Sequence, residues 1–298
     1  MLIDNQDDLY ELSEQQLNSL SSLEDASAAR LREALRSSFD RVLKSVDQNW
    51  ESLQAVGGLA LQTELYKLDQ IRATLEILTP EAAASIRAEF EAIFKEGAIA
   101  GDTLAQELIK ARTNNTVRTF SDLPIVALAN IATESMQRLK SHTVTFQNKA
   151  TSILLQGISQ GWGRARVKRE LSRQLNIVSY RAERIQRTET LSALNAASLQ
   201  RYQNERVALV QFLPTGDDRT CPICADRAGE VYRIDQAPKS QIHPLCRCVL
   251  VPADDLTLRD REWSTNFAKE VKELAGGKTD PRPAAFETVR PIPVEVFG

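Results

Sequence analysis

All four cysteines of this 298-residue chain lie between residues 221 and 248. With one histidine they form the pattern C-x2-C-x18-H-x2-C-x-C. Two such cysteine pairs can hold one tetrahedral cation between distant segments, and a mixed cysteine and histidine set favours zinc. We therefore expect a structural zinc ion that staples a small β-rich unit, because such a unit buries little core by itself. The candidate ligands are Cys221, Cys224, His243, Cys246 and Cys248, of which we favour the first four, with Cys248 as the substitute.

Two alternatives to structural zinc stay open on the sequence alone. One is a set of buried thiols without a metal, or with a disulfide formed after cell lysis. The other is a catalytic metal, which needs a ligand position open to substrate. The chain has no H-E-x-x-H, no P-loop and no G-x-S-x-G, and no H-x-E precedes the P-C-x-x-C segment, because His142 is followed by Thr-Val. These absences favour a protein that is not an enzyme.

The charge of the chain is unevenly distributed. A net charge of −3 excludes a protein that coats nucleic acid through overall positive charge. Residues 160–206, however, carry ten Arg and Lys against four Glu. A solvated helix face with local ion pairs explains most such runs, and contact with phosphate or an acidic protein surface is the functional alternative. The candidate contact residues are Arg164, Arg166, Lys168, Arg169, Arg181 and Arg184.

Apolar residues recur at helical spacing through the first half of the chain. One stripe runs from Leu20 to Val46, and a second from Leu61 to Leu78. The pattern predicts further helices from Pro80 to near Gly97, from Asp102 to about Arg112, from about 122 to 157, from Ser159 to Leu175, and from Tyr180 to about Asn204.

The residue pattern changes from helical spacing to short apolar runs after residue 204. Short apolar runs predict strands at 207–213, 229–234 and 247–251, followed by a helix over 258–274 and an extended Pro-rich arm over 281–298. The predicted fold is mainly α, with a small Cys/His-stapled α+β C-terminal domain whose strands are antiparallel. We divide the chain into an N-terminal helical region (1–156), a domain with the Cys/His cluster (157–255) and a C-terminal helix and arm (256–298).

The sequence indicates no membrane segment. No apolar run approaches the ~18 residues that span a bilayer. The acidic start MLIDNQDDLYELSEQQ also lacks the basic and apolar regions of a signal peptide. We therefore expect a protein that is made and kept in a cytoplasm.

The C-terminal half resembles the Mu F-like minor head proteins of tailed double-stranded DNA bacteriophages. The resemblance covers about residues 150–255 and rests on three motifs in order. These are the helix with Arg187-Thr-Glu189, the turn Asp217-Asp-Arg-Thr-Cys-Pro-Ile-Cys224 and the ending His243-Pro-Leu-Cys-Arg-Cys248.

The resemblance implies a non-enzymatic virion component of the phage head that acts in head morphogenesis at the portal vertex. Its implied partners are the portal protein, with several copies around it, and further capsid or scaffolding proteins and packaged double-stranded DNA. Such a chain is assembled into the virion in the host cytoplasm. Arg187 and Glu189 are assigned to holding their helix against the cysteine-bearing unit, and Asp217 and Arg219 to structural or interaction roles.

The rival functions are a zinc-dependent nuclease or hydrolase and a zinc-knuckle nucleic-acid-binding protein. A hydrolase would need an open metal position and a nearby general base, for which Asp217 or Asp218 is the candidate.

Overall fold

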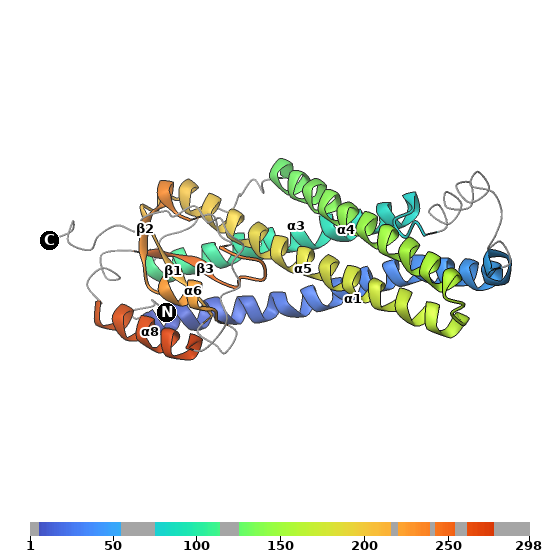
Figure 1. Ribbon diagram of the computed structural model, residues 1–298. Helices are drawn as coiled ribbons and strands as arrows, with labels where there is room; N and C mark the ends of the chain where they lie inside the picture. Colours follow the sequence, from blue (N-terminus) through green and yellow to red (C-terminus); the bar gives the residue numbers. More distant parts are fainter. Residues whose placement is uncertain are drawn as a thin grey trace. The chain divides into compact units, whose positions relative to one another are not determined.

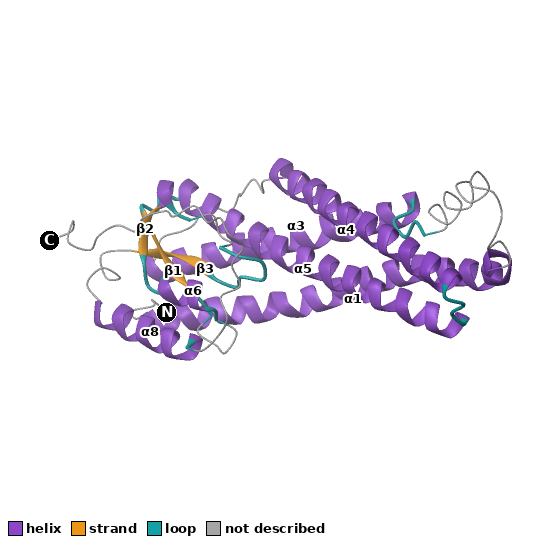
Figure 2. Cartoon of the chain, in the orientation of Figure 1, coloured by secondary structure: helices purple, strands orange, loops and turns teal. Residues whose placement is uncertain are grey.

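The computed structural model describes residues 6–54, 75–113, 125–215, 220–238, 242–253 and 261–276 (Figures 1 and 2). Long α-helices make up most of these ranges, and a small three-stranded antiparallel sheet follows them. The predicted fold class is therefore confirmed. The helices are α1 (Gln6–Gln54), α3 (Pro80–Thr113), α4 (Ile125–Ser159), α5 (Arg164–Asn204), α6 (Pro222–Asp226) and α8 (Arg261–Ala275), with a short 3-10 turn at Ile234–Gln236.

The chain forms two compact units, each built from separate segments. The first unit comprises Met1–Glu24, Ile93–Leu128 and Arg187–Gly298, and the second comprises Asp25–Ala92 and Ala129–Gln186. Helices α1, α3, α4 and α5 each contribute residues to both units. The division of the chain at residues 156 and 255 stays a prediction.

The second unit is a helical assembly with an apolar core. The predicted stripe of α1 supplies Leu31, Leu35, Phe39, Val42 and Val46, all of them buried. Phe39 meets Phe146 of α4 edge to face, with 5.9 Å between ring centroids. The stripe is not buried throughout, since Leu23 in the first unit is 45% exposed.

Helix α3 runs without a break from Pro80 to Thr113. Its start at Pro80 agrees with the sequence, since Pro is favoured in the first helical turn. The predicted end near Gly97 and the predicted new start at Asp102 are wrong. Within the first unit, Gly97 and Gly101 instead allow α3 to approach the backbone of α5 closely. A β-carbon at Gly97 would lie 2.6 Å from the carbonyl oxygen of Thr190, and one at Gly101 would overlap that of Leu194.

Helix α5 is also one continuous element, where the sequence analysis expected two. The predicted break before Tyr180 is wrong because the buried stripe continues through it. Leu171, Leu175, Val178 and Ala182 are all buried, and no Gly or Pro interrupts this part of the helix.

The sheet has the strand order β2–β1–β3, and both pairings are antiparallel. Its strands are β1 (Leu209–Leu213), β2 (Val231–Arg233) and β3 (Val249–Ala253), so all three predicted strands exist with slightly shifted bounds. Side chains of β1 and β3 are almost all buried, because the sheet packs into the core of the first unit.

Some predicted elements lie outside the described residues. These are most of the second apolar stripe and the extended arm over 281–298. Helix α8 confirms the predicted helix near 258–274. Among the described helices, none is apolar over enough of its length to cross a membrane.

Candidate metal centre

The first cysteine pair is placed by the short helix α6. Cys221 is the extended residue before the helix, Pro222 opens it, and Cys224 lies in its first turn. Pro fits there because its fixed φ suits a first helical residue. The amide of Ala225 donates to the carbonyl of Cys221 at 3.0 Å, which closes the turn. Both thiols are buried in the first unit.

His243 and Cys246 lie in a tight turn before strand β3. The amide of Cys246 donates to the carbonyl of His243 at 3.2 Å. Leu245 takes a left-handed conformation with φ 63°, which is rare for a residue with a β-carbon. The strand predicted over 247–251 includes Cys248, and this is wrong, because β3 begins at Val249. The thiols of Cys246 and Cys248 are nevertheless buried.

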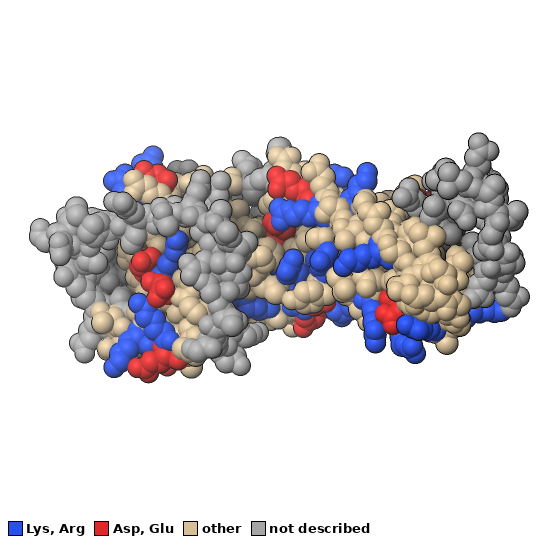
Figure 3. Space-filling model, viewed as in Figure 1, with Lys and Arg blue, Asp and Glu red and all other residues tan. Residues whose placement is uncertain are grey.

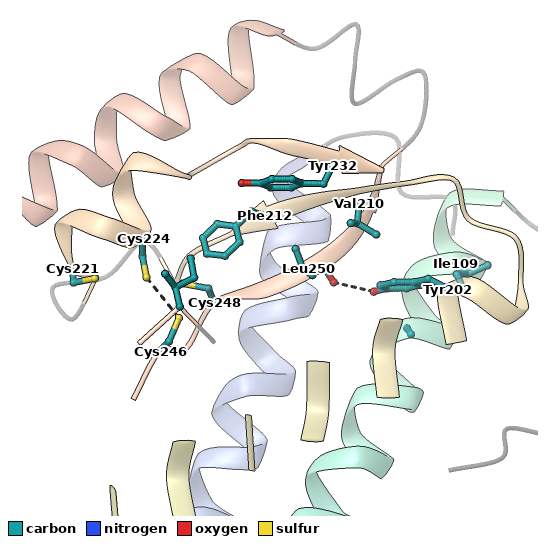
Figure 4. Packing of buried hydrophobic residues seen from close by; sticks show 12 residues of the cluster. Ile109, Tyr202, Val210, Phe212, Cys221, Cys224, Tyr232, Cys246, Cys248 and Leu250 are labelled. Carbon is teal, nitrogen blue, oxygen red and sulfur yellow. Dashed lines mark hydrogen bonds between the residues drawn. The ribbon is translucent and has the colours of Figure 1, made fainter. Parts of the chain in front are cut away.

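The structure brings all five candidate ligands together. The imidazole Nε2 of His243 lies 3.1 Å from the Cys221 sulfur and 3.0 Å from the Cys224 sulfur. The sulfur atoms of Cys224 and Cys246 are 3.6 Å apart. Cys224 is common to two groups of potential ligands, one with Cys221 and His243 and the other with Cys246 and Cys248. Figure 4 shows the sulfur atoms of Cys224, Cys246 and Cys248 directed toward one another.

These donors fit a zinc ion. With usual zinc bond lengths, a tetrahedral site has sulfur–sulfur edges of about 3.8 Å and sulfur–nitrogen edges of about 3.6 Å. The Cys224–Cys246 edge matches, while the two edges to His243 are about half an ångström shorter. His243 Nδ1 lies 2.8 Å from the carbonyl oxygen of Pro244, so a proton on Nδ1 is donated there and Nε2 is left to bind a metal. Which four of the five residues bind stays a prediction.

The cluster also has strongly perturbed proton affinities. Hydrogen bonding to Cys224, and then to His243, lowers the pKa of Cys221 to about 4. The pKa of Cys246 is also lowered, first by Cys224 and then by Cys248. Burial opposes charge on His243, but hydrogen bonds to Cys221 and Cys246 raise its pKa to about 10. The pKa values of Cys224 and Cys248 are raised, the first by hydrogen bonding to Cys221 and the second by burial. A site that stabilises thiolates in this way suits a cation.

Helix α5 holds the histidine turn through the residues of the Arg-Thr-Glu motif. The hydroxyl oxygen of Thr188 accepts a hydrogen bond from the amide of Leu245 at 3.1 Å. Glu24 of α1 lies 3.7 Å from the guanidinium of Arg187 and 3.1 Å from that of Arg247. Arg187 thus reaches the cysteine-bearing turn through a buried carboxylate. Glu189 is buried on the same helix, and its assigned role stays a prediction.

Asn195 is a supporting residue that the sequence analysis missed. Its side-chain amide donates to the carbonyl of Cys248 at 3.1 Å and accepts from the amide of Leu250 at 3.4 Å. It thereby pairs with the start of β3 as a neighbouring strand would. Asparagine is unfavourable inside a helix, so its place on the buried face of α5 was the available signal.

Within the second unit, some candidate contact residues of α5 already contact another side chain, and others have no acidic partner among the described residues. Lys168 binds the carboxylate of Asp47 at 2.8 Å, and Arg164 lies 4.0 Å from the same carboxylate. Arg166 lies over the ring of Trp162, 3.9 Å from its centroid. Arg181 lies 3.2 Å from His142. Arg169 is exposed, Arg184 is partly buried, and no acidic partner is found for either in the described part of the chain. Asp217, Asp218 and Arg219 lie outside the described residues.

Comparison with known proteins finds a family match over this part of the chain. Residues 148–251 match the family model described as Phage Mu protein F like protein. The chain has no significant match among curated proteins, and none among solved structures. The matched range contains all of α5 and all five Cys and His residues of the cluster. The resemblance inferred from the three motifs is therefore confirmed, since residues 148–251 are similar to the phage Mu protein F like family.

Proposed function

We propose that this chain is a minor head protein of a tailed double-stranded DNA bacteriophage, which acts in head morphogenesis at the portal vertex. The observation that carries the proposal is the coincidence of the family match with a physical unit. Within the matched range, Thr188 of the helix motif contacts Leu245 of the histidine turn, and that turn meets the Cys221–Cys224 turn at the candidate metal centre.

The proposed role of the centre is structural, with zinc as the metal. All four thiols are buried, and in the described ranges neither group of potential ligands includes a carboxylate. A closed site of four protein ligands leaves no position for substrate. Its contribution is to join α6 to the turn before β3, two segments whose cysteines also lie in one buried apolar cluster. The chain is accordingly proposed to be a non-enzymatic virion component.

The proposed partners follow from the family and from the charge of the chain. The portal protein is the main one, contacted by several copies of this chain, with capsid or scaffolding proteins as further neighbours. The basic segment of α5 supports contact with packaged double-stranded DNA. Phage heads are the expected location.

The metal is tested by comparing the two histidines of the chain. We expect about one zinc per chain, measured by elemental analysis of protein purified without chelator. His243→Ala should lose most of this zinc and unfold at a lower temperature, whereas the control His142→Ala should keep it. Less than a tenth of a zinc per wild-type chain would contradict the proposed centre. Equal zinc in both variants would contradict His243 as a ligand and favour the four cysteines instead.

The assembly role is tested in the phage that encodes the chain. An amber mutation in its gene should reduce infectious particles, and the chain should be found in purified virions and should co-purify with the portal protein. Normal particle yields together with absence of the chain from virions would refute the proposal. The variant Glu24→Gln, which weakens the link between α5 and the histidine turn, should reduce particle yield less than the amber mutation.

A further inference from the structure

Helix α5 carries one continuous face within the second unit that is exposed from residue 166 to residue 180 and partly buried at residues 181 and 184. An α-helix advances 100° per residue, so residues 166, 169, 173, 177, 180, 181 and 184 fall within a sector of about 120°. From residue 166 to residue 184 this sector is about 27 Å long, at 1.5 Å per residue. We call it the arginine face, and its members are Arg166, Arg169, Arg173, Ile177, Tyr180, Arg181 and Arg184.

The opposite side of α5 is neutralised or buried. Val167, Leu171 and Leu175 face the core, and Lys168 and Arg164 lie beside Asp47 of α1. These two cations were candidate contact residues in the sequence analysis, but in the structure they share the carboxylate of Asp47, which binds Lys168 at 2.8 Å and lies 4.0 Å from Arg164. The basic segment is therefore divided by the fold, and the residues with uncompensated charge lie on the other side of the helix.

The arginine face keeps most of its positive charge. The acidic residue that lies within its sector, Glu170, is 3.1 Å from Arg173 and compensates that arginine alone. The neighbouring part of α4, from Lys140 to Ser159, has Lys140 and Lys149 and no Asp or Glu, whereas Arg138 is paired with Glu134 at 3.3 Å. Where Figure 1 draws α4 and α5, Figure 3 shows more Lys and Arg (blue) than Asp and Glu (red) among the uncharged residues.

The apolar content of the face is small but exposed. Tyr180 is 59% exposed and Ile177 is 40% exposed, between the two groups of arginines. A protein–protein interface has an apolar core with charged residues at its rim, and two side chains do not form such a core. Sites for single-stranded nucleic acid stack successive bases on several aromatic rings, whereas this face offers one.

Arginine side chains at these positions match the phosphates of a duplex. Guanidinium groups bind phosphate oxygens through two parallel hydrogen bonds, and Arg166 is held in place by stacking on Trp162, 3.9 Å from the ring centroid. A straight row of about 27 Å spans about eight base pairs at 3.4 Å each. The hydroxyl of Tyr180 adds a neutral donor in the middle of the row.

We infer that the arginine face of α5 binds the phosphate backbone of double-stranded DNA, without sequence preference. The inference deepens one part of the proposed function, the contact with packaged DNA, and assigns it to Arg166, Arg169, Arg181 and Arg184 and not to Arg164 or Lys168. Contacts to phosphate carry no sequence information, so random and defined duplexes bind equally.

The test is a salt titration of purified full-length protein with a fluorescently labelled 25-base-pair duplex, followed by anisotropy. Four phosphate contacts give a slope of log K against log salt of about −3.6. The double variant Arg169→Gln/Arg184→Gln should reduce the magnitude of this slope by about 2 and weaken binding about sixtyfold at 0.1 M salt. The control Arg233→Gln removes an exposed arginine that is paired with Asp235, and should leave both quantities unchanged.

Two results would overturn the inference. One is an unchanged slope and affinity for the double variant that still has the wild-type circular dichroism spectrum. The second result uses polyglutamate of equal charge as another labelled probe. If the double variant loses the wild-type binding to polyglutamate and still binds the duplex as the wild type does, the partner is an acidic protein surface. In either case the proposed head function would still hold if the amber mutation reduces the yield of infectious particles.

Discussion

The close approach of α3 and α5 in the first unit gives a sharp test of the structure. Gly101 lies against the backbone of Leu194, and the β-carbon of an alanine there would overlap the Leu194 carbonyl oxygen. It would also lie 2.7 Å from the carbonyl carbon and 2.9 Å from the Cα atom of Leu194. Ordinary contacts of this kind are 3.4 Å or longer. Gly101→Ala therefore requires the two helices to separate locally by about 1 Å.

The expected cost combines three effects. Overpacking of a well-packed helix contact costs about 1–3 kcal/mol. The hydroxyl of Ser198 donates to the Gly101 carbonyl at 2.8 Å, and separation of the helices removes this buried hydrogen bond at about 1 kcal/mol. Alanine is the better helix former by about 0.5–1 kcal/mol, which offsets part of the loss. We expect a net destabilisation of about 2–3 kcal/mol.

Thermal unfolding followed by circular dichroism measures this effect. The expected loss lowers the unfolding temperature by about 4–12 °C. The matched control is Gly163→Ala, because a β-carbon at Gly163 meets no atom within 4 Å. Gly163 is the N-cap residue of α5, where alanine is less favourable than glycine, so that control should cost no more than about 1 kcal/mol. If Gly101→Ala is as stable as the wild type, or more stable, the interpretation of this glycine as a close-approach residue is wrong.

Three further variants test buried or perturbed side chains. Asn195→Ala should lower the free energy of unfolding by about 2–4 kcal/mol in urea titrations, because the Cys248 carbonyl and the Leu250 amide both lose their side-chain partner. Arg201→Ala should cost about 3–5 kcal/mol, since it leaves the carboxylate of Asp102 without the guanidinium at 2.7 Å, and a variant of normal stability would contradict this buried ion pair. Burial, and then Arg181 and Arg184, lower the pKa of His142, so its contribution to stability is present above about pH 6.5 and is lost as the pH falls below it. His142→Gln should therefore lose less stability than the wild type between pH 7 and pH 5, and equal losses would refute the assignment.

Local chemistry explains which parts of the site the sequence predicts. The spacing of Cys221 and Cys224 defines a turn, and that of His243 and Cys246 defines another, so each pair follows from a few adjacent residues. Thr188 and Glu24 could not be assigned as partners in the same way. Their contacts with Leu245 and Arg247 span 57 and 223 residues of sequence, so they depend on how the helices pack.

Glycine shows why helix ends are harder to predict than helix faces. The apolar periodicity of α3 identifies its buried face correctly, with Ile86, Phe90 and Phe94 fully buried. A glycine such as Gly97 is typical of a helix end, and it is equally typical of a close contact between two helices. Only the partner helix distinguishes the two, and here the backbone oxygen of Thr190 occupies the space that a β-carbon would need.

Charge patterns show the same dependence on distant partners. Arg164 and Lys168 look equivalent to Arg166 and Arg169 in the sequence, because all four precede the same apolar stripe. Asp47 lies 121 residues before Lys168 and binds it at 2.8 Å, which removes the first two from the free basic surface. A run of basic residues therefore overstates a binding surface until the fold shows which side of the helix has acidic neighbours.

The order of the family motifs also has a physical explanation in this chain. Leu245 has a left-handed backbone conformation, and its amide needs an acceptor once the turn is packed against a helix. Thr188 supplies that acceptor, and Asn195, two turns further along α5, orients the strand that leaves the turn. One helix thus holds the histidine turn at Leu245 and the start of the following strand at Cys248. Loss of the metal should therefore loosen the Cys221–Cys224 turn first, while the histidine turn stays attached to α5.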